Sequence, residues 1–209
     1  MSGHPERAGA TRQRLADHAR GYDWDAVLSV LAEHPEFINS TRPGGDSWYA
    51  PLHQAAHGGA PVPIVDRLLE AGAWRGLRTA RGERPVDIAE RLGRTHLVDR
   101  LRPERYLDVP PHVLQRIQGR FHEVIHGRVH DLVQEHGLRL PELEVLLELS
   151  EPKAWFAVPG MYGGFNFWLE AEHDDVRLVT ESWCRVVDGS GQRHIVTADD
   201  ARLVDEGFV

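Results

Sequence analysis

The stretch that decides the fold of the first half of the chain is APLHQAA at residues 50–56, which returns as RPVDIAE at residues 84–90. An amphipathic run follows each copy, IVDRLLEAGA at 64–73 and GRTHLVDRL at 93–101. The prolines of the two copies lie 34 residues apart, and proline suits the first turn of a helix, where a missing N–H costs nothing. The pattern predicts two helix–turn–helix units, which must stack because one unit alone cannot bury its apolar face.

A partial unit precedes these two copies. Residues 22–31 are typical of the second helix of such a unit, and residues 34–39 of the turn that follows it. Residues 14–19 are typical of a shortened first helix. About three units are near the minimum that such a stack needs, because the outer ones act as caps. We therefore expect an all-α N-terminal domain at residues 11–105.

The two copies resemble the ankyrin repeat family, whose units open on Thr-Pro-Leu-His-x-Ala-Ala and close on Leu-Leu-x-x-Gly-Ala. The resemblance covers about residues 12–104 and implies a scaffold that binds another protein through its hairpin tips and its concave helix face. At the positions of those tips stand aromatic and arginine side chains, the types that concentrate binding energy. These are Trp48, Tyr49, Trp74, Arg75, Arg78 and Arg81. Their alternative role is turn packing and solubility.

Prolines between residues 102 and 111 mark the start of a second domain, which we place at residues 110–209. An apolar stripe at helical spacing predicts one long amphipathic helix over about residues 112–136. Alternating patterns then predict five or six antiparallel strands, with candidates at residues 143–149, 154–158, 164–170, 176–187, 194–197 and 201–204. The predicted fold class is α+β, with ankyrin-type helical repeats followed by a long helix packed on an antiparallel β-meander.

Composition excludes several classes of protein. The formal charge of −8 argues against general nucleic-acid affinity. No apolar run approaches the length of a membrane span, and the N-terminus lacks the apolar core of a secretory signal. The single cysteine leaves no internal disulfide framework and fits a reducing cytoplasm. We expect no cofactor.

One motif in the predicted long helix suggests metal chemistry. His122-Glu123-Val124-Ile125-His126 matches H-E-x-x-H, in which two histidines bind zinc and the glutamate activates water. His130 adds a third imidazole, and Glu144 or Glu148 is a conceivable further ligand. However, the chain holds 13 histidines, which favours a chance match, and the sheet of a zinc peptidase usually precedes this helix. A solvated or interdomain histidine edge is therefore the favoured interpretation.

Two weaker candidates lie in the predicted strands. Cys184 needs a nearby base to act as a nucleophile, for which His194 is conceivable, but a lone strand cysteine is more often a small buried hydrophobe. Several aromatic side chains have the spacing to line a concave pocket, although core packing is their commoner use. They are Trp155, Tyr162, Phe167, Trp168 and Trp183.

The leading functional hypothesis is noncatalytic protein recognition of a regulatory, adaptor or immunity-like kind, with another protein as the partner. The competing hypothesis places an enzyme or a small-ligand sensor in the C-terminal domain, including a zinc hydrolase that uses His122, Glu123 and His126. The sequence favours the first hypothesis because its clearest pattern is a binding scaffold.

Overall fold

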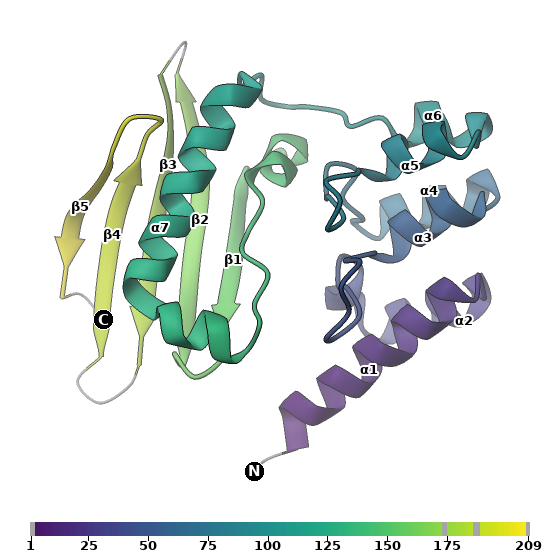
Figure 1. The fold of residues 1–209 in the computed structure, drawn as a ribbon, viewed down its shortest axis with the longest axis horizontal. Helices are drawn as coiled ribbons and strands as arrows, with labels where there is room; N and C mark the ends of the chain where they lie inside the picture. The colour runs from purple at the N-terminus through teal and green to yellow at the C-terminus, as the bar shows by residue number, and fades with distance from the viewer. Residues whose placement is uncertain (1–2, 173–174, 186–188, 208–209) are drawn as a thin grey trace. The chain divides into compact units, whose positions relative to one another are not determined.

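The structure, a computed structural model, describes residues 3–172, 175–185 and 189–207. It divides into two compact units, residues 1–104 and 105–209, and each is described by itself below. Helices build the first unit, whereas the second contains a five-stranded antiparallel sheet (Figure 1). The predicted α+β class is therefore confirmed.

Paired helices build the N-terminal unit, with a short 3-10 helix after the second one. Their bounds are α1 Gly3–Arg20, α2 Trp24–Glu33, η1 Pro35–Phe37, α3 Pro51–Gly58, α4 Val62–Glu70, α5 Pro85–Arg91 and α6 Thr95–Leu101. Within each pair the two helices contact each other, and α1, α3 and α5 also contact one another in turn. One hydrophobic core runs through all three pairs.

Local sequence explains where the paired helices begin, end and approach each other. Pro51 and Pro85 occupy the first turns of α3 and α5, where proline costs no hydrogen bond. Gly59, after α3, has a φ of 66°, a left-handed conformation that favours glycine at a helix end. Ala55 and Ala89 are fully buried, and their small side chains let α3 and α5 pack closely.

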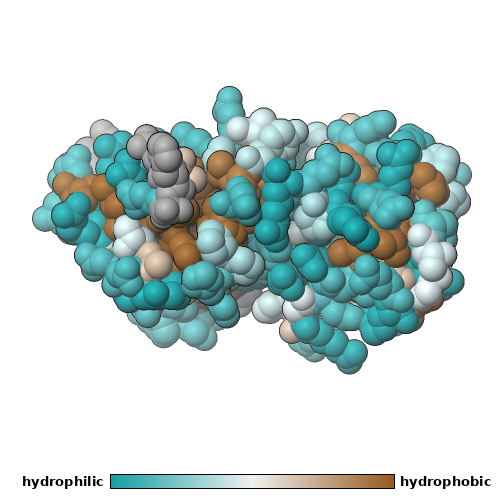
Figure 2. All heavy atoms as spheres, turned by 90° about the horizontal axis from the view of Figure 1, so that it is seen from above, coloured by the Kyte–Doolittle hydropathy of each residue, from teal (hydrophilic) through white to brown (hydrophobic). Residues whose placement is uncertain are grey.

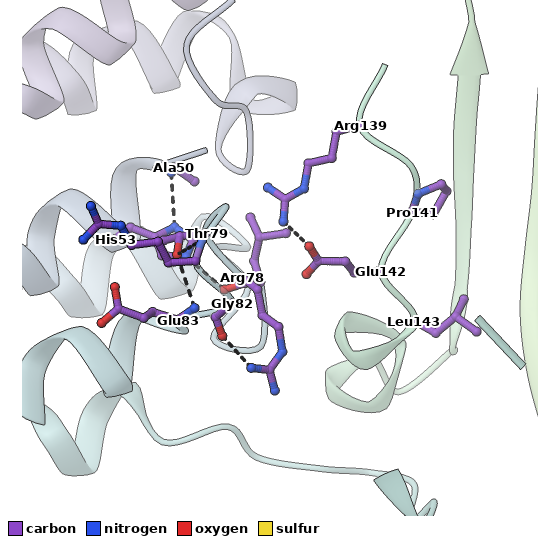
Figure 3. A network of polar contacts seen from close by, with 12 residues as sticks. Ala50, His53, Arg78, Thr79, Gly82, Glu83, Arg139, Pro141, Glu142 and Leu143 are labelled. Atoms are coloured by element: carbon purple, nitrogen blue, oxygen red, sulfur yellow. Dashed lines mark hydrogen bonds and ion pairs between the residues drawn. The ribbon is translucent and has the colours of Figure 1, made fainter. Parts of the chain in front are cut away.

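A buried histidine joins the loops of neighbouring helix pairs (Figure 3). The backbone N–H of Ala50 donates to Nδ1 of His53 at 3.1 Å. Because Nδ1 accepts this bond, the ring proton lies on Nε2, which donates to the carbonyl of Leu77 at 2.9 Å. His53 is fully buried, so it satisfies two backbone groups that water cannot reach.

The loops between the pairs also bond directly to each other. Asn39 donates to the carbonyl of Gly72 and accepts from the backbone N–H of Trp74, each at 2.9 Å. Nearer the loop tips, the N–H of Ala80 donates to the carbonyl of Ser47 at 3.1 Å. These bonds hold the two loops as one layer beside the helices.

The C-terminal unit packs one long helix on an antiparallel meander. Its elements are α7 Pro111–Glu135, η2 Leu143–Glu148, β1 Lys153–Val158, β2 Gly163–Glu172, β3 Asp175–Cys184, β4 Ser190–Val196 and β5 Ala201–Glu206. The strands lie in the order β1-β2-β3-β4-β5, and α7 crosses one face of the sheet (Figure 1). Phe121 of α7 contacts Phe165 and Phe167 of β2 at ring-centroid distances of 6.3 and 5.0 Å.

The prediction of a strand at residues 143–149 is wrong, because Leu143–Glu148 forms a 3-10 helix. Leu143, Leu146 and Leu147 are all buried, and their spacing of three and four residues is helical. The strand prediction treated the same apolar residues as an alternating strand pattern and overlooked this helical spacing. The sheet therefore has five strands among the described residues.

Hydrophobic side chains also reach the surface of both units. The space-filling view shows mainly hydrophilic residues, with hydrophobic ones in separate patches (Figure 2). The largest exposed apolar side chains are aromatic or lie in β5. They are Tyr22, Trp48, Tyr106, Trp155, Tyr162, Leu203 and Val204.

We expect His53→Ala to destabilise the N-terminal unit by about 2–4 kcal/mol, because the change empties a buried volume and leaves two backbone groups unpaired. Urea denaturation followed by circular dichroism measures the loss. His34→Ala, at a partly exposed position in the same unit, is the control. An equal loss in the two variants contradicts the role assigned to His53.

Candidate functional site

Two of the predicted binding residues lie directly before α3. Trp48 is 38% exposed and has a φ of 56°, so its backbone is held in a conformation that costs a side-chain-bearing residue energy. Tyr49 is half-buried and packs edge-on against His53 and His57, with ring centroids 5.7 and 6.1 Å apart. Trp48 thus presents an exposed indole beside an aromatic contact along α3.

Trp74 and Arg75 both form hydrogen bonds with other residues of the N-terminal unit. The backbone N–H of Trp74 donates to Asn39, and its side chain is half-buried. The Nε of Arg75 donates to the carbonyl of Arg100 at 3.0 Å, and an Nη atom lies 3.8 Å from Glu104. Arg75 therefore binds the end of α6.

Arg78 and Arg81 belong to the loop between α4 and α5. Nη1 of Arg78 donates to the carbonyl of Gly82 at 2.6 Å, which closes the loop tip (Figure 3). The backbone N–H of Arg81 donates to Oγ1 of Thr79, which is buried, and the Arg81 side chain is exposed. Arg81 is thus the more exposed of the two arginines.

The sequence analysis did not select three residues that contact Tyr49 or one another, namely Tyr22, His57 and Arg91. The hydroxyl of Tyr22 lies 2.7 Å from Nδ1 of His57, and the two rings stack at a centroid distance of 6.4 Å. Arg91 of α5 makes a 2.6 Å bond to Glu83 and interacts with Tyr49. We call Tyr22, Tyr49, His57 and Arg91 the aromatic row, which runs from the turn before α2 across α3 to α5.

The aromatic row has a weak signal in the sequence. Tyr49, His53 and His57 recur every four residues, which places His53 and His57 on one side of α3 and Tyr49 in line with them, two residues before the helix begins. Tyr22 has no such signal, because it lies in a turn with a φ of 59° and meets His57 only through the fold. The row offers aromatic faces, a hydroxyl and a guanidinium, which suit binding to another surface.

The H-E-x-x-H residues do not come together as a metal centre. His122 is partly buried and its Nε2 donates to the carbonyl of Pro141 at 2.8 Å. His126 and His130 instead lie beside each other, with their Nδ1 atoms 3.2 Å apart, and Glu123 is exposed. Across residues 3–172, 175–185 and 189–207, no group of three or more His, Cys, Asp or Glu side chains is placed to hold a metal ion.

Cys184 and His194 lie at different positions along the β3–β4 pair. Cys184 is opposite Ser190, whereas His194 is opposite Thr180. Arg128 of α7 donates to the carbonyl and the hydroxyl of Ser190, at 2.7 and 2.9 Å. The strand register therefore does not give Cys184 the neighbouring base that a nucleophile needs.

The aromatic side chains of the C-terminal unit separate into three settings. Phe167 is in the core. Trp168 donates to Glu170 at 3.0 Å, and the ammonium group of Lys153 lies over its ring. The remaining three line a surface pocket of about 290 Å³ together with Gly163 and Arg185; they are Trp155, Tyr162 and Trp183.

Comparison with known proteins gives no family for this chain. No protein-family model and no curated protein sequence matches it. A solved structure that it resembles contains the predatory endopeptidase Bd0816 of Bdellovibrio bacteriovorus in complex with the immunity protein Bd3460. That match has 24% sequence identity and a TM-score of 0.35, and covers 42% of each chain. Such a likeness is too distant to indicate a shared function.

The described residues contain no helix that is long and apolar enough to cross a membrane.

We predict that acidification destabilises the C-terminal unit through His122 and His194. Burial is the main effect that lowers the pKa of both imidazoles from 6.5. At His122 it outweighs the raising effect of the bond to Pro141, and nearby His126 lowers the pKa further. At His194 the positive charge of Arg128 adds to the lowering. A lowered histidine pKa contributes stability that is complete above the unfolded pKa and is lost as pH falls through about 6.5 toward the folded pKa. The urea concentration at the unfolding midpoint should therefore decrease when the pH is lowered from about 7.5 to about 5.5.

The double variant His122→Gln/His194→Gln should flatten this pH dependence, and His112→Gln, at an exposed position of α7, is the control. If the double variant follows the wild-type profile, these two imidazoles are not the source of the acid sensitivity.

Proposed function

We propose that this chain is a noncatalytic interaction protein, in which the N-terminal unit is an ankyrin-type stack that binds another protein. The binding surface consists of the aromatic row and the loop tips that carry Trp48, Arg78 and Arg81. The observation that carries the proposal is the aromatic row, because it joins side chains from successive helix pairs into one surface.

The chemistry of this surface suits protein recognition. Tyrosine, tryptophan and arginine dominate the energetics of protein interfaces because they combine large contact areas with directional polar groups. Trp48 and Tyr22 are 38% and 42% exposed, so a partner gains apolar contact by covering them. The local hydrogen bonds of Tyr22 and Arg91 limit their side-chain motion, which reduces the entropy that binding costs.

The fixed loops support the same proposal. Asn39 and the Ser47–Ala80 pair hold the two loops as one layer, so Trp48 and Arg81 belong to one prearranged surface. The bonds of Arg75 to Arg100 and Glu104 favour a stabilising role for that residue, so we exclude it from the proposed contact set. The biological role of the complex is of a regulatory, adaptor or immunity-like kind.

We expect the double variant Trp48→Ala/Arg81→Ala to weaken partner binding at least about tenfold without lowering the melting temperature, because both side chains are exposed. The partner is identified by affinity capture of the intact chain from native lysate with mass spectrometry. Its affinity for wild type and variants is then measured by calorimetry.

Arg67→Ala on α4 is the matched control, because it removes an exposed arginine outside the proposed surface. Retained affinity in Trp48→Ala/Arg81→Ala, with an unchanged melting temperature, contradicts the assigned surface. A partner that still binds after deletion of residues 1–104 contradicts the assignment of binding to the N-terminal unit.

A further inference from the structure

The pocket of the C-terminal unit lies on the sheet face opposite α7. Side chains alternate along a strand, and Phe156 and Phe165 on one face belong to the core that includes α7. Trp155 and Trp183 therefore point to the other face, where their ring centroids are 5.9 Å apart. Trp155 is 51% exposed even though it lies beside a second indole.

Tyr162 and Arg185 complete the walls of this pocket of about 290 Å³. Tyr162 is 76% exposed and has a φ of 50°, in the left-handed region that side-chain-bearing residues seldom adopt. The next residue, Gly163, pairs with Val158 of β1 and also lines the pocket. Tyr162 thus lies in the β1–β2 turn and lines the same pocket as the two indoles.

Backbone packing fixes this turn. A Cβ on Gly163 would lie 1.9 Å from the carbonyl oxygen of Trp183, and one on Gly164 would lie 2.2 Å from that of Phe156. The N–H of Arg185 donates to the carbonyl of Met161, which is fully buried, at 3.2 Å. Close contacts and a cross-strand bond therefore fix the backbone that carries Tyr162, Trp183 and Arg185.

The polar groups of these walls select the chemistry of a ligand. An indole N–H and a guanidinium donate hydrogen bonds and accept none, and a tyrosine hydroxyl can donate as well. A ligand that matches Trp155, Tyr162 and Arg185 therefore has apolar groups to cover the rings, several acceptors and few donors. Proline supplies this combination, because its ring is apolar and its backbone has a carbonyl but no N–H.

We propose that this pocket binds a proline-rich peptide in the extended polyproline II conformation, with an acidic residue that pairs with Arg185. Successive prolines form a stiff helix that pays little ordering entropy on binding, and grooves lined by aromatic side chains recognise such segments. This site lies in the other unit from the surface proposed above, so each proposal can fail without the other.

Other ligands fit the walls less well. The hydroxyls of an oligosaccharide are donors as well as acceptors, and the indole and guanidinium groups of the walls offer no acceptor for their protons. A quaternary ammonium suits an aromatic cage, but here it would meet the positive charge of Arg185. A proline-rich segment with an acidic residue has neither mismatch.

The test titrates the full chain, labelled on its indole N–H groups, with a blocked hexaproline peptide that ends in aspartate. Binding is followed by NMR. We expect the Trp155 and Trp183 signals to shift, and Trp155→Ala to weaken binding at least about tenfold, as removal of an interface tryptophan does. Arg185→Glu should reverse the preference for aspartate over arginine at the end of the peptide.

Tyr106→Ala is the matched control, because it removes an exposed aromatic side chain of the same unit that does not line the pocket, and it should leave peptide affinity unchanged. A hexa-alanine peptide ending in aspartate and a cello-oligosaccharide are the comparison ligands. The proposal is overturned if the Trp155 and Trp183 signals stay fixed at millimolar hexaproline, or if either comparison ligand binds as tightly. It is equally overturned if Trp155→Ala, folded as the wild type, keeps its affinity.

Discussion

The hydrogen bonds of His53 are the constraint on which the N-terminal unit most depends. A fully buried imidazole accepts from the N–H of its own loop and donates to Leu77 in the next, so one side chain sets both the start of α3 and the distance to the following loop. This bond and those of Asn39 join the loops through His53 and Asn39, neither of which belongs to the exposed tips that carry Trp48 and Arg81.

The pattern of the sequence predicted the α+β class because periodicity is a local property. Prolines mark the first turns of α3 and α5, and glycines follow α3 and α4 in left-handed conformations. The error at residues 143–149 has a physical cause, since a short apolar run satisfies a strand and a helix about equally well. What decided it was burial of Leu143, Leu146 and Leu147 together, which depends on the neighbouring helix and sheet.

The candidate sites were less predictable because side chains far apart in the chain build them. Residue type and position in the sequence pattern led to the prediction of Trp48 and Arg81 as contact residues, and both are exposed. The contact of Tyr22 with His57 spans 35 residues and depends on helix stacking, which residue type does not reveal. Arg75 has the residue type and position expected of a contact residue, but its side chain bonds to the carbonyl of Arg100 at the end of α6. In the C-terminal unit, the strand register decided which aromatic side chains share a pocket.

The two copies of the opening motif differ at the residue that joins one helix pair to the next, and this difference gives the stack a direction. Asp87 replaces the histidine and folds back onto its own loop, accepting from the N–H of Arg84 at 2.8 Å and from its guanidinium at 3.0 Å. His53 reaches forward to a neighbour, whereas Asp87 is satisfied within its own unit. The helix α5 therefore lacks the bond to a following loop that His53 gives α3, and the linkage between successive loops runs in one direction only.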